Sequence, residues 1–63
     1  MTELEKLYQN MADTLEQGMT DLEKFEAGNM SAGTRVRKNM QAVKDLAQKI
    51  RVTVQEQKNA VVA

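Results

Sequence analysis

Apolar and small residues recur at alternating spacings of four and three along the first part of the chain. They are Leu4, Tyr8, Met11, Leu15, Gly18, Leu22 and Phe25, and Leu7 and Met19 widen the stripe. Because residues three and four apart share one face of an α-helix, this pattern predicts an amphipathic helix over about residues 2–27 that packs lengthwise against another helix. Thr2 and Glu5 have the spacing of a capping box, which favours a helix start close to the N-terminus.

The same alternation resumes later and predicts a second amphipathic helix over about residues 31–58. Its apolar seam consists of Val36, Met40, Val43, Ala47, Ile50 and Val54, and Leu46 broadens it. Gln57 interrupts the alternation, so residues 59–63 are expected to form a frayed tail.

Two residues suffice to turn the chain between the helices. Gly28 suits the left-handed position just after a helix, and Asn29 suits the N-cap of the next helix, with Ser31 as an alternative cap. We therefore expect a turn over about residues 28–30. Gly18 lies within the seam, where a glycine allows a partner helix to approach closely. Gly33, placed near a helix start, indicates a second close approach to the backbone.

These elements predict an all-α fold in which residues 1–63 form a single domain, an antiparallel two-helix hairpin that resembles a coiled coil. The 63 residues include no cysteine and no proline, so disulfides cannot compensate for a small core. One hairpin covers only part of two broad apolar stripes. We therefore expect a homodimer that closes the stripes into a four-helix bundle; a longer antiparallel or exchanged arrangement is the alternative.

The formal net charge of zero hides an asymmetry between the two halves of the chain. Residues 1–27 carry two basic and seven acidic side chains, a net charge of −5. Residues 28–63 carry seven basic and two acidic side chains, a net charge of +5. The halves can pair with each other, or the basic half can bind a polyanion while the acidic half faces away.

The composition argues against catalysis and against bound cofactors or metals. The chain has no histidine and no cysteine, and two amphipathic helices offer no pocket that excludes water around paired carboxylates. Gly28 and Gly33 have the spacing of a phosphate-binding loop, but Thr34 stands where that loop requires lysine. No stretch approaches the ~20 apolar residues of a membrane span, and the acidic N-terminus is unlike an export signal. We expect a cytoplasmic protein without a small-molecule substrate.

A basic cluster opens the second helix. Arg35, Arg37 and Lys38 lie within its first turns, where the helix dipole also favours anions, so they are candidate ligands for DNA phosphates. The alternative is that they neutralise Glu23 and Glu26 across the turn.

Further basic residues follow along the same helix. Lys44, Lys49 and Arg51 are candidate helpers of the cluster in binding DNA. A row spaced by sevens, Arg37, Lys44, Arg51 and Lys58, lies along one flank of the seam. This row either binds a polyanion or pairs with acidic side chains of the first helix or of a partner chain.

The turn and the basic cluster resemble the small linker-histone-like proteins of chlamydiae and other bacteria. The matching residues are Glu26, Gly28, Asn29, Ala32, Gly33, Thr34, Arg35, Val36, Arg37 and Lys38, followed by the spaced apolar positions to about Lys58. The resemblance implies sequence-independent binding of double-stranded DNA and a role in organising the bacterial nucleoid. It also implies a lysine-rich tail; this sequence ends at Val61-Val62-Ala63 without one, so we expect a short member of the family.

Two functions remain open from the sequence. The first is a non-enzymatic, dimeric, histone-like protein that contacts DNA phosphates. The alternative is a helical oligomerisation or adaptor module that binds a protein partner through its apolar seams.

Overall fold

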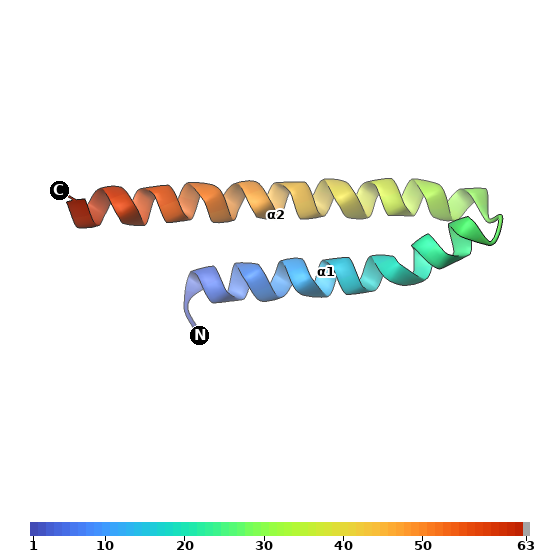
Figure 1. The fold of residues 1–63 in the computed structure, drawn as a ribbon, viewed down its shortest axis with the longest axis horizontal. Helices are drawn as coiled ribbons and strands as arrows, with labels where there is room; N and C mark the ends of the chain where they lie inside the picture. Colours follow the sequence, from blue (N-terminus) through green and yellow to red (C-terminus); the bar gives the residue numbers. More distant parts are fainter. Residues whose placement is uncertain (63) are drawn as a thin grey trace.

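The computed structural model describes residues 1–62 and shows two helices, α1 (Glu3–Glu26) and α2 (Met30–Val62). The helices lie side by side and antiparallel, and the described residues contain no strand (Figure 1). The Cα atoms span 53 × 19 × 10 Å, so the hairpin is a single layer of helices. The predicted all-α antiparallel hairpin is confirmed.

The N-terminus of α1 is closed by the predicted capping box. The backbone N–H of Thr2 donates to a Glu5 carboxylate oxygen at 2.9 Å, and the backbone N–H of Glu5 donates to the Thr2 hydroxyl oxygen at 3.1 Å. The N–H of Thr2 and, to a lesser extent, its side chain lower the pKa of the Glu5 carboxyl, because both interactions favour the charged form. The box satisfies donors that the first helical turn leaves free.

The turn between the helices is built by the two residues that the sequence indicates. Gly28 has φ +107°, a backbone conformation that is costly for residues with a Cβ. Its N–H donates to the Phe25 carbonyl, and the N–H of Asn29 donates to the Lys24 carbonyl, each at 3.0 Å. These two bonds form a Schellman motif that ends α1. The Asn29 side-chain oxygen then accepts from the N–H of Ala32 at 3.3 Å and caps α2.

The helices pack through a seam that is rotated from the predicted one. The half-buried or buried residues are Leu4, Leu7, Met11, Thr14, Gly18 and Asp21 of α1 and Ala32, Gly33, Val36, Asn39, Val43, Leu46, Ala47, Ile50 and Thr53 of α2. Tyr8, Leu15 and Leu22, which the apolar pattern places in the seam, are 62%, 47% and 39% exposed. The prediction was wrong on this point because α1 has two adjacent apolar stripes and one partner helix covers only one of them.

A glycine and an amide fix the register of the two helices. Asn39 donates from its side-chain nitrogen to the Thr14 carbonyl at 2.7 Å, and its side-chain oxygen is buried without a hydrogen-bond partner among the described residues. A Cβ at Gly18 would lie 2.6 Å from Cγ of Asn39, so the amide fits only beside a glycine. At Gly33 a Cβ would lie 2.8 Å from the ring of Phe25. Both glycines therefore make room for side chains of the opposite helix.

The second helix is longer than predicted. It continues through Val62 instead of fraying from residue 59, while residue 63 lies outside the described residues. No glycine or proline follows Gly33, and Gln57, Lys58 and Ala60 are good helix formers. The last turns extend beyond the start of α1 (Figure 1), and Val61 is 86% exposed.

Candidate nucleic-acid interface

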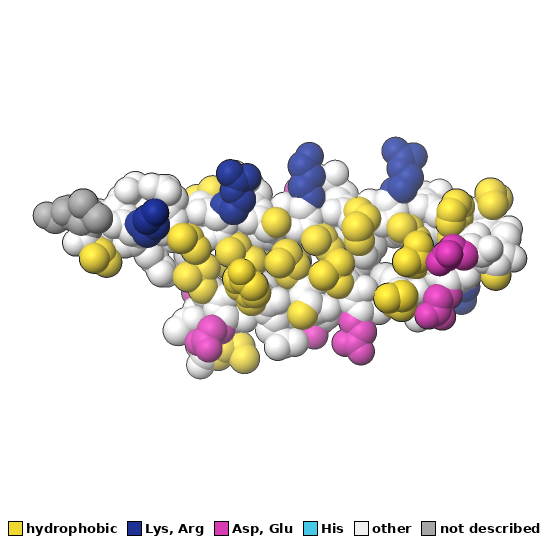
Figure 2. All heavy atoms as spheres, in the orientation of Figure 1, with side chains coloured by type: hydrophobic (Ala, Val, Ile, Leu, Met, Phe, Trp, Pro, Cys, Tyr) yellow, Lys and Arg dark blue, Asp and Glu magenta, His cyan; other side chains and the backbone are white. Residues whose placement is uncertain are grey.

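Four basic side chains form a line along one edge of α2, which we call the basic row. They are Arg37, Lys44, Arg51 and Lys58, and all four are exposed. Residues seven apart in a helix lie about 10.5 Å apart along its axis and on nearly the same side, so the row is about 31 Å long. Figure 2 shows Lys and Arg side chains spaced along the α2 edge of the molecule and Asp and Glu mainly along the α1 edge.

The basic row borders the apolar surface that the hairpin leaves open. Arg37 lines a hollow together with Leu22 and Phe25, and Lys58 lines another with Leu4 and Val54. In Figure 2 a band of hydrophobic side chains runs along the junction of the helices beside the row. The aliphatic stems of Arg37 and Lys58 therefore lie beside apolar groups while their charged ends remain in water. Lys44 and Arg51 line a third hollow with Asp45, Ala47 and Gln48.

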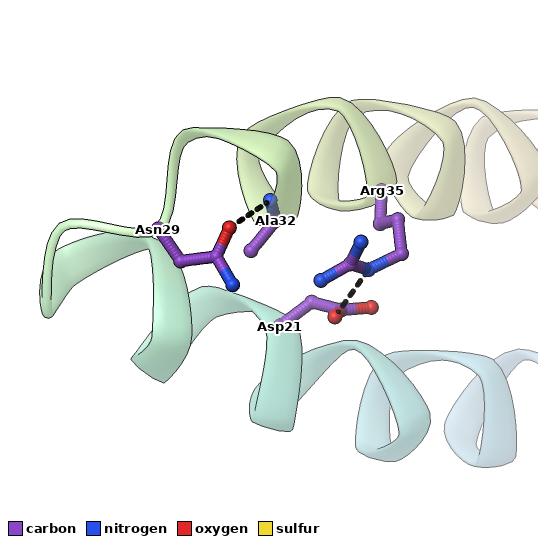
Figure 3. Close-up of polar contacts among 4 residues, drawn as sticks. All are labelled: Asp21, Asn29, Ala32 and Arg35. Atoms are coloured by element: carbon purple, nitrogen blue, oxygen red, sulfur yellow. Dashed lines mark hydrogen bonds and ion pairs between the residues drawn. The ribbon is translucent and has the colours of Figure 1, made fainter.

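Arg35 lies apart from this row. Its guanidinium Nε donates to a carboxylate oxygen of Asp21 at 2.7 Å (Figure 3), and the two side chains are 47% and 24% exposed. Among residues 1–62 this is the ion pair that the structure contains, so Glu23 and Glu26 do not neutralise the cluster as the alternative interpretation proposed. Two residues correspond to about 200° around a helix, which places Arg35 on the side opposite Arg37.

The other two candidates also lie off the row. Lys49 follows Arg35 by two heptads and shares its side of α2, where it lines a hollow with Glu3 and Leu7. Lys38 is rotated by about 100° from Arg37, away from the apolar surface. Of the sequence-predicted site residues Arg35, Arg37, Lys38, Lys44, Lys49 and Arg51, the structure thus aligns three in one row. Lys58 completes the row, and the seven-residue spacing was its signal.

Residues 1–62 contain no group of three acidic, histidine or cysteine side chains arranged to hold a metal ion. No helix in the same range is both long enough and apolar enough to cross a bilayer. What the exposed residues can do is attract a polyanion along α2, since guanidinium and ammonium groups spaced along a helix are suited to phosphates.

Comparison with known proteins supports this interpretation. Neither the curated proteins nor the solved structures include a match to the chain. A family model described as histone H1-like protein Hc1 matches residues 5–60, which are 56 of the 63 residues and span both helices and the turn. Histone H1-like proteins are a DNA-packaging, non-enzymatic class. The resemblance seen in the turn and basic cluster is confirmed, and the chain belongs to the histone H1-like Hc1 family of DNA-binding, nucleoid-associated proteins.

Proposed function

We propose that this chain binds double-stranded DNA without sequence specificity, through phosphate contacts of the basic row, and thereby contributes to organising the nucleoid in the bacterial cytoplasm. The observation that carries the proposal is the alignment of four exposed cations along one edge of α2. The family match favours DNA as the polyanion that the basic row binds. It also favours DNA binding over the adaptor alternative.

The dimensions of the row suit a duplex. Its length of about 31 Å is close to the ~34 Å of one turn of B-DNA, so its cations can reach phosphates over most of a turn. Phosphate contacts position a protein on DNA but carry no base information. Each cation sits on a long flexible stem, which lets its charged end follow the local path of the backbone. Arg35, Lys38 and Lys49 supply further positive charge from the other sides of α2.

Counterion release gives the proposal a quantitative form. Four neutralised phosphates give a slope of about −3.6 for log affinity against log salt. That slope corresponds to a loss of roughly 150-fold in affinity between about 50 and 200 mM salt. Binding should therefore be measurable at low salt and weak near physiological salt.

A fluorescence-anisotropy titration on a mixed-sequence duplex tests the assignment. Lys44→Gln with Arg51→Gln removes two charges from the row, and the magnitude of the slope should fall by about 1.8. The control is Lys6→Gln with Lys24→Gln, which makes the same change in net charge on α1 and should leave the slope nearly unchanged. Equal losses in both double variants would refute the row as the site, and absence of binding at about 50 mM salt would refute DNA binding itself.

A competition with duplexes of different sequence tests the lack of specificity. Mixed, A·T-rich and G·C-rich duplexes of equal length should displace the labelled duplex within a few-fold of one another. A preference of a hundredfold, about 2.7 kcal/mol, would indicate contacts to base edges that the proposal does not include.

A further inference from the structure

A row of uncharged polar side chains runs beside the basic row on α2, and we call it the neutral row. Its members are exposed and seven residues apart: Thr34, Gln41, Gln48 and Gln55. Each of them precedes one cation of the basic row by three residues. The chain therefore repeats one unit four times: Thr34 with Arg37, Gln41 with Lys44, Gln48 with Arg51, and Gln55 with Lys58. Side chains three apart in a helix are neighbours, with Cβ atoms about 5–6 Å apart.

The basic row has no carboxylate at the helical spacings that form ion pairs. Three and four residues before and after every member of the row, the sequence holds uncharged side chains. The lysines of α1 differ, because Glu3 precedes Lys6 by three residues and Asp21 precedes Lys24 by three. The cations of the row thus keep their charge for a ligand. The helical neighbours that can share that ligand are the amides and the hydroxyl of the neutral row.

The hollow in the middle of the two rows brings both kinds of side chain together. Lys44, Gln48 and Arg51 line it, and Asp45 lines it as well. An ammonium, an amide and a guanidinium group all supply hydrogen-bond donors. The Asp45 carboxylate accepts a hydrogen bond from Nε2 of Gln41 at 3.1 Å. The hollow therefore offers an anion two cations and a neutral donor on one helix.

The neutral row points away from α1. Gln48 precedes the buried Ile50 by two residues, or about 200° around the helix, so its side chain lies opposite the seam. The same reasoning turns Glu16 of α1 away from α2, because it precedes the seam residue Gly18 by two. Figure 2 agrees, with Lys and Arg along the α2 edge and Asp and Glu mainly along the α1 edge. A duplex that meets the neutral row therefore has the acidic half of the chain on the far side of the hairpin.

We propose that the neutral row binds the same DNA phosphates as the basic row, so that each pair holds one phosphate by an ionic contact and a neutral hydrogen bond. This inference rests on the proposed function and adds residues to its site. Glutamine and threonine side chains are regular donors to DNA phosphates. A neutral donor and a cation whose Cβ atoms are about 5–6 Å apart can converge on the oxygens of one phosphate.

The two rows contribute differently to the salt dependence of binding. Each cation that neutralises a phosphate releases counterions and adds about 0.9 to the magnitude of the slope of log affinity against log salt. A neutral donor releases no counterion, so its share of the affinity is the same at every salt concentration. Removal of neutral donors should therefore weaken binding by a constant factor and leave the slope near about −3.6.

Fluorescence-anisotropy titrations on a mixed-sequence duplex at several salt concentrations test this inference. Gln48→Ala with Gln55→Ala should weaken binding about tenfold at every salt concentration, with an unchanged slope. Gln9→Ala with Gln17→Ala is the matched control, because it makes the same change at exposed positions of α1 and should leave both affinity and slope unchanged. Alanine is a better helix former than glutamine, and circular dichroism of each variant checks that the helices persist.

The outcomes separate this inference from the proposed function. Equal affinities of the Gln48→Ala, Gln55→Ala variant and the unmodified chain, with the slope retained, would overturn the inference alone. Absence of binding by the unmodified chain at about 50 mM salt would refute the proposed function itself. A reduced slope in the alanine variant would mean that the amides act through the cations. A loss confined to A·T-rich duplexes would place the amides on base edges. Either of these last two results would overturn the shared phosphate contact.

A substitution that adds charge gives a second readout. Gln48→Lys converts a neutral donor into a cation and should raise the magnitude of the slope by about 0.9. Gln17→Lys makes the same change in net charge on α1 and should leave the slope nearly unchanged. Equal slopes for the two variants would contradict the contact between Gln48 and a phosphate.

Discussion

Replacing Gly18 with alanine should destabilise this protein, although the same change stabilises most helices. In an ordinary helix interior, alanine is favoured over glycine by about 1 kcal/mol because glycine loses more backbone freedom. Here the new Cβ would lie 2.6 Å from Cγ of Asn39 and closer still to its side-chain oxygen. The amide is held by its hydrogen bond to the Thr14 carbonyl and cannot move without breaking that bond.

The balance of these effects sets the expected size. Forcing an extra methyl group into a packed contact costs about 1–3 kcal/mol, and losing the hydrogen bond adds about 1 kcal/mol. After the helix-propensity gain of about 1 kcal/mol, Gly18→Ala should lower the free energy of unfolding by about 1–3 kcal/mol. For a domain of this size each kcal/mol corresponds to roughly 4–8 °C in Tm.

A double-mutant cycle isolates the cause. In an Asn39→Ala background the steric conflict is gone, so Gly18→Ala should become stabilising by about 1 kcal/mol. The coupling energy between the two sites should therefore be about 2–4 kcal/mol. Thermal unfolding followed by circular dichroism at one fixed protein concentration measures all four variants, and Gln17→Ala, at an exposed neighbouring position, is the control. A stabilising Gly18→Ala in both backgrounds would refute this account of the register.

Three smaller changes test other parts of the hairpin. Gly28→Ala should lower the free energy of unfolding by about 1–2 kcal/mol, since φ +107° is strained for alanine; an unchanged urea midpoint would contradict this. The second change concerns Glu5, whose hydrogen bonds with Thr2 lower the pKa of its carboxyl group. The stabilising effect of these bonds is therefore present above the ordinary carboxyl pKa and is lost as pH falls through the lowered pKa. The protection factors of the amides at the start of α1, which compare measured with intrinsic exchange rates at each pH, should therefore fall in acid, and Glu5→Gln should remove that dependence. Arg35→Gln should cost under about 1 kcal/mol at low salt, since the ion pair with Asp21 is partly exposed, and unfolding in about 1 M salt should show no difference.

The ends of the helices were predictable because local rules fix them. Thr2 with Glu5, and Gly28 with Asn29, act through hydrogen bonds to the nearby backbone, so their chemistry is readable without knowing the rest of the fold. The basic row was also visible from spacing alone. Its seven-residue spacing includes Lys58, which the predicted set of DNA-binding residues did not.

The face of α1 that packs against α2 was less predictable, because α1 has two adjacent apolar stripes and one partner helix covers only one of them. Hydrophobicity alone ranks Leu15 and Leu22 above Thr14 and Asp21, yet the hairpin turns the polar pair inward. Asp21 gains an ion pair with Arg35, and the Thr14 carbonyl gains a bond from Asn39. These contacts join residues that are distant in sequence, so no local sequence pattern predicts them.

The sequence by itself determined that this chain forms two antiparallel amphipathic helices joined at Gly28, with acidic and basic side chains separated between them. Helical periodicity and capping depend on residues close in sequence, so they can be recognised without knowledge of the tertiary contacts. The tertiary structure alone decided which stripe each helix buries, that Arg35 lies apart from the basic row, and that Gly18 accommodates an amide. Those outcomes depend on the rotation of α1 and α2 about their own axes relative to each other. That rotation is set by steric fit and by contacts between residues distant in sequence.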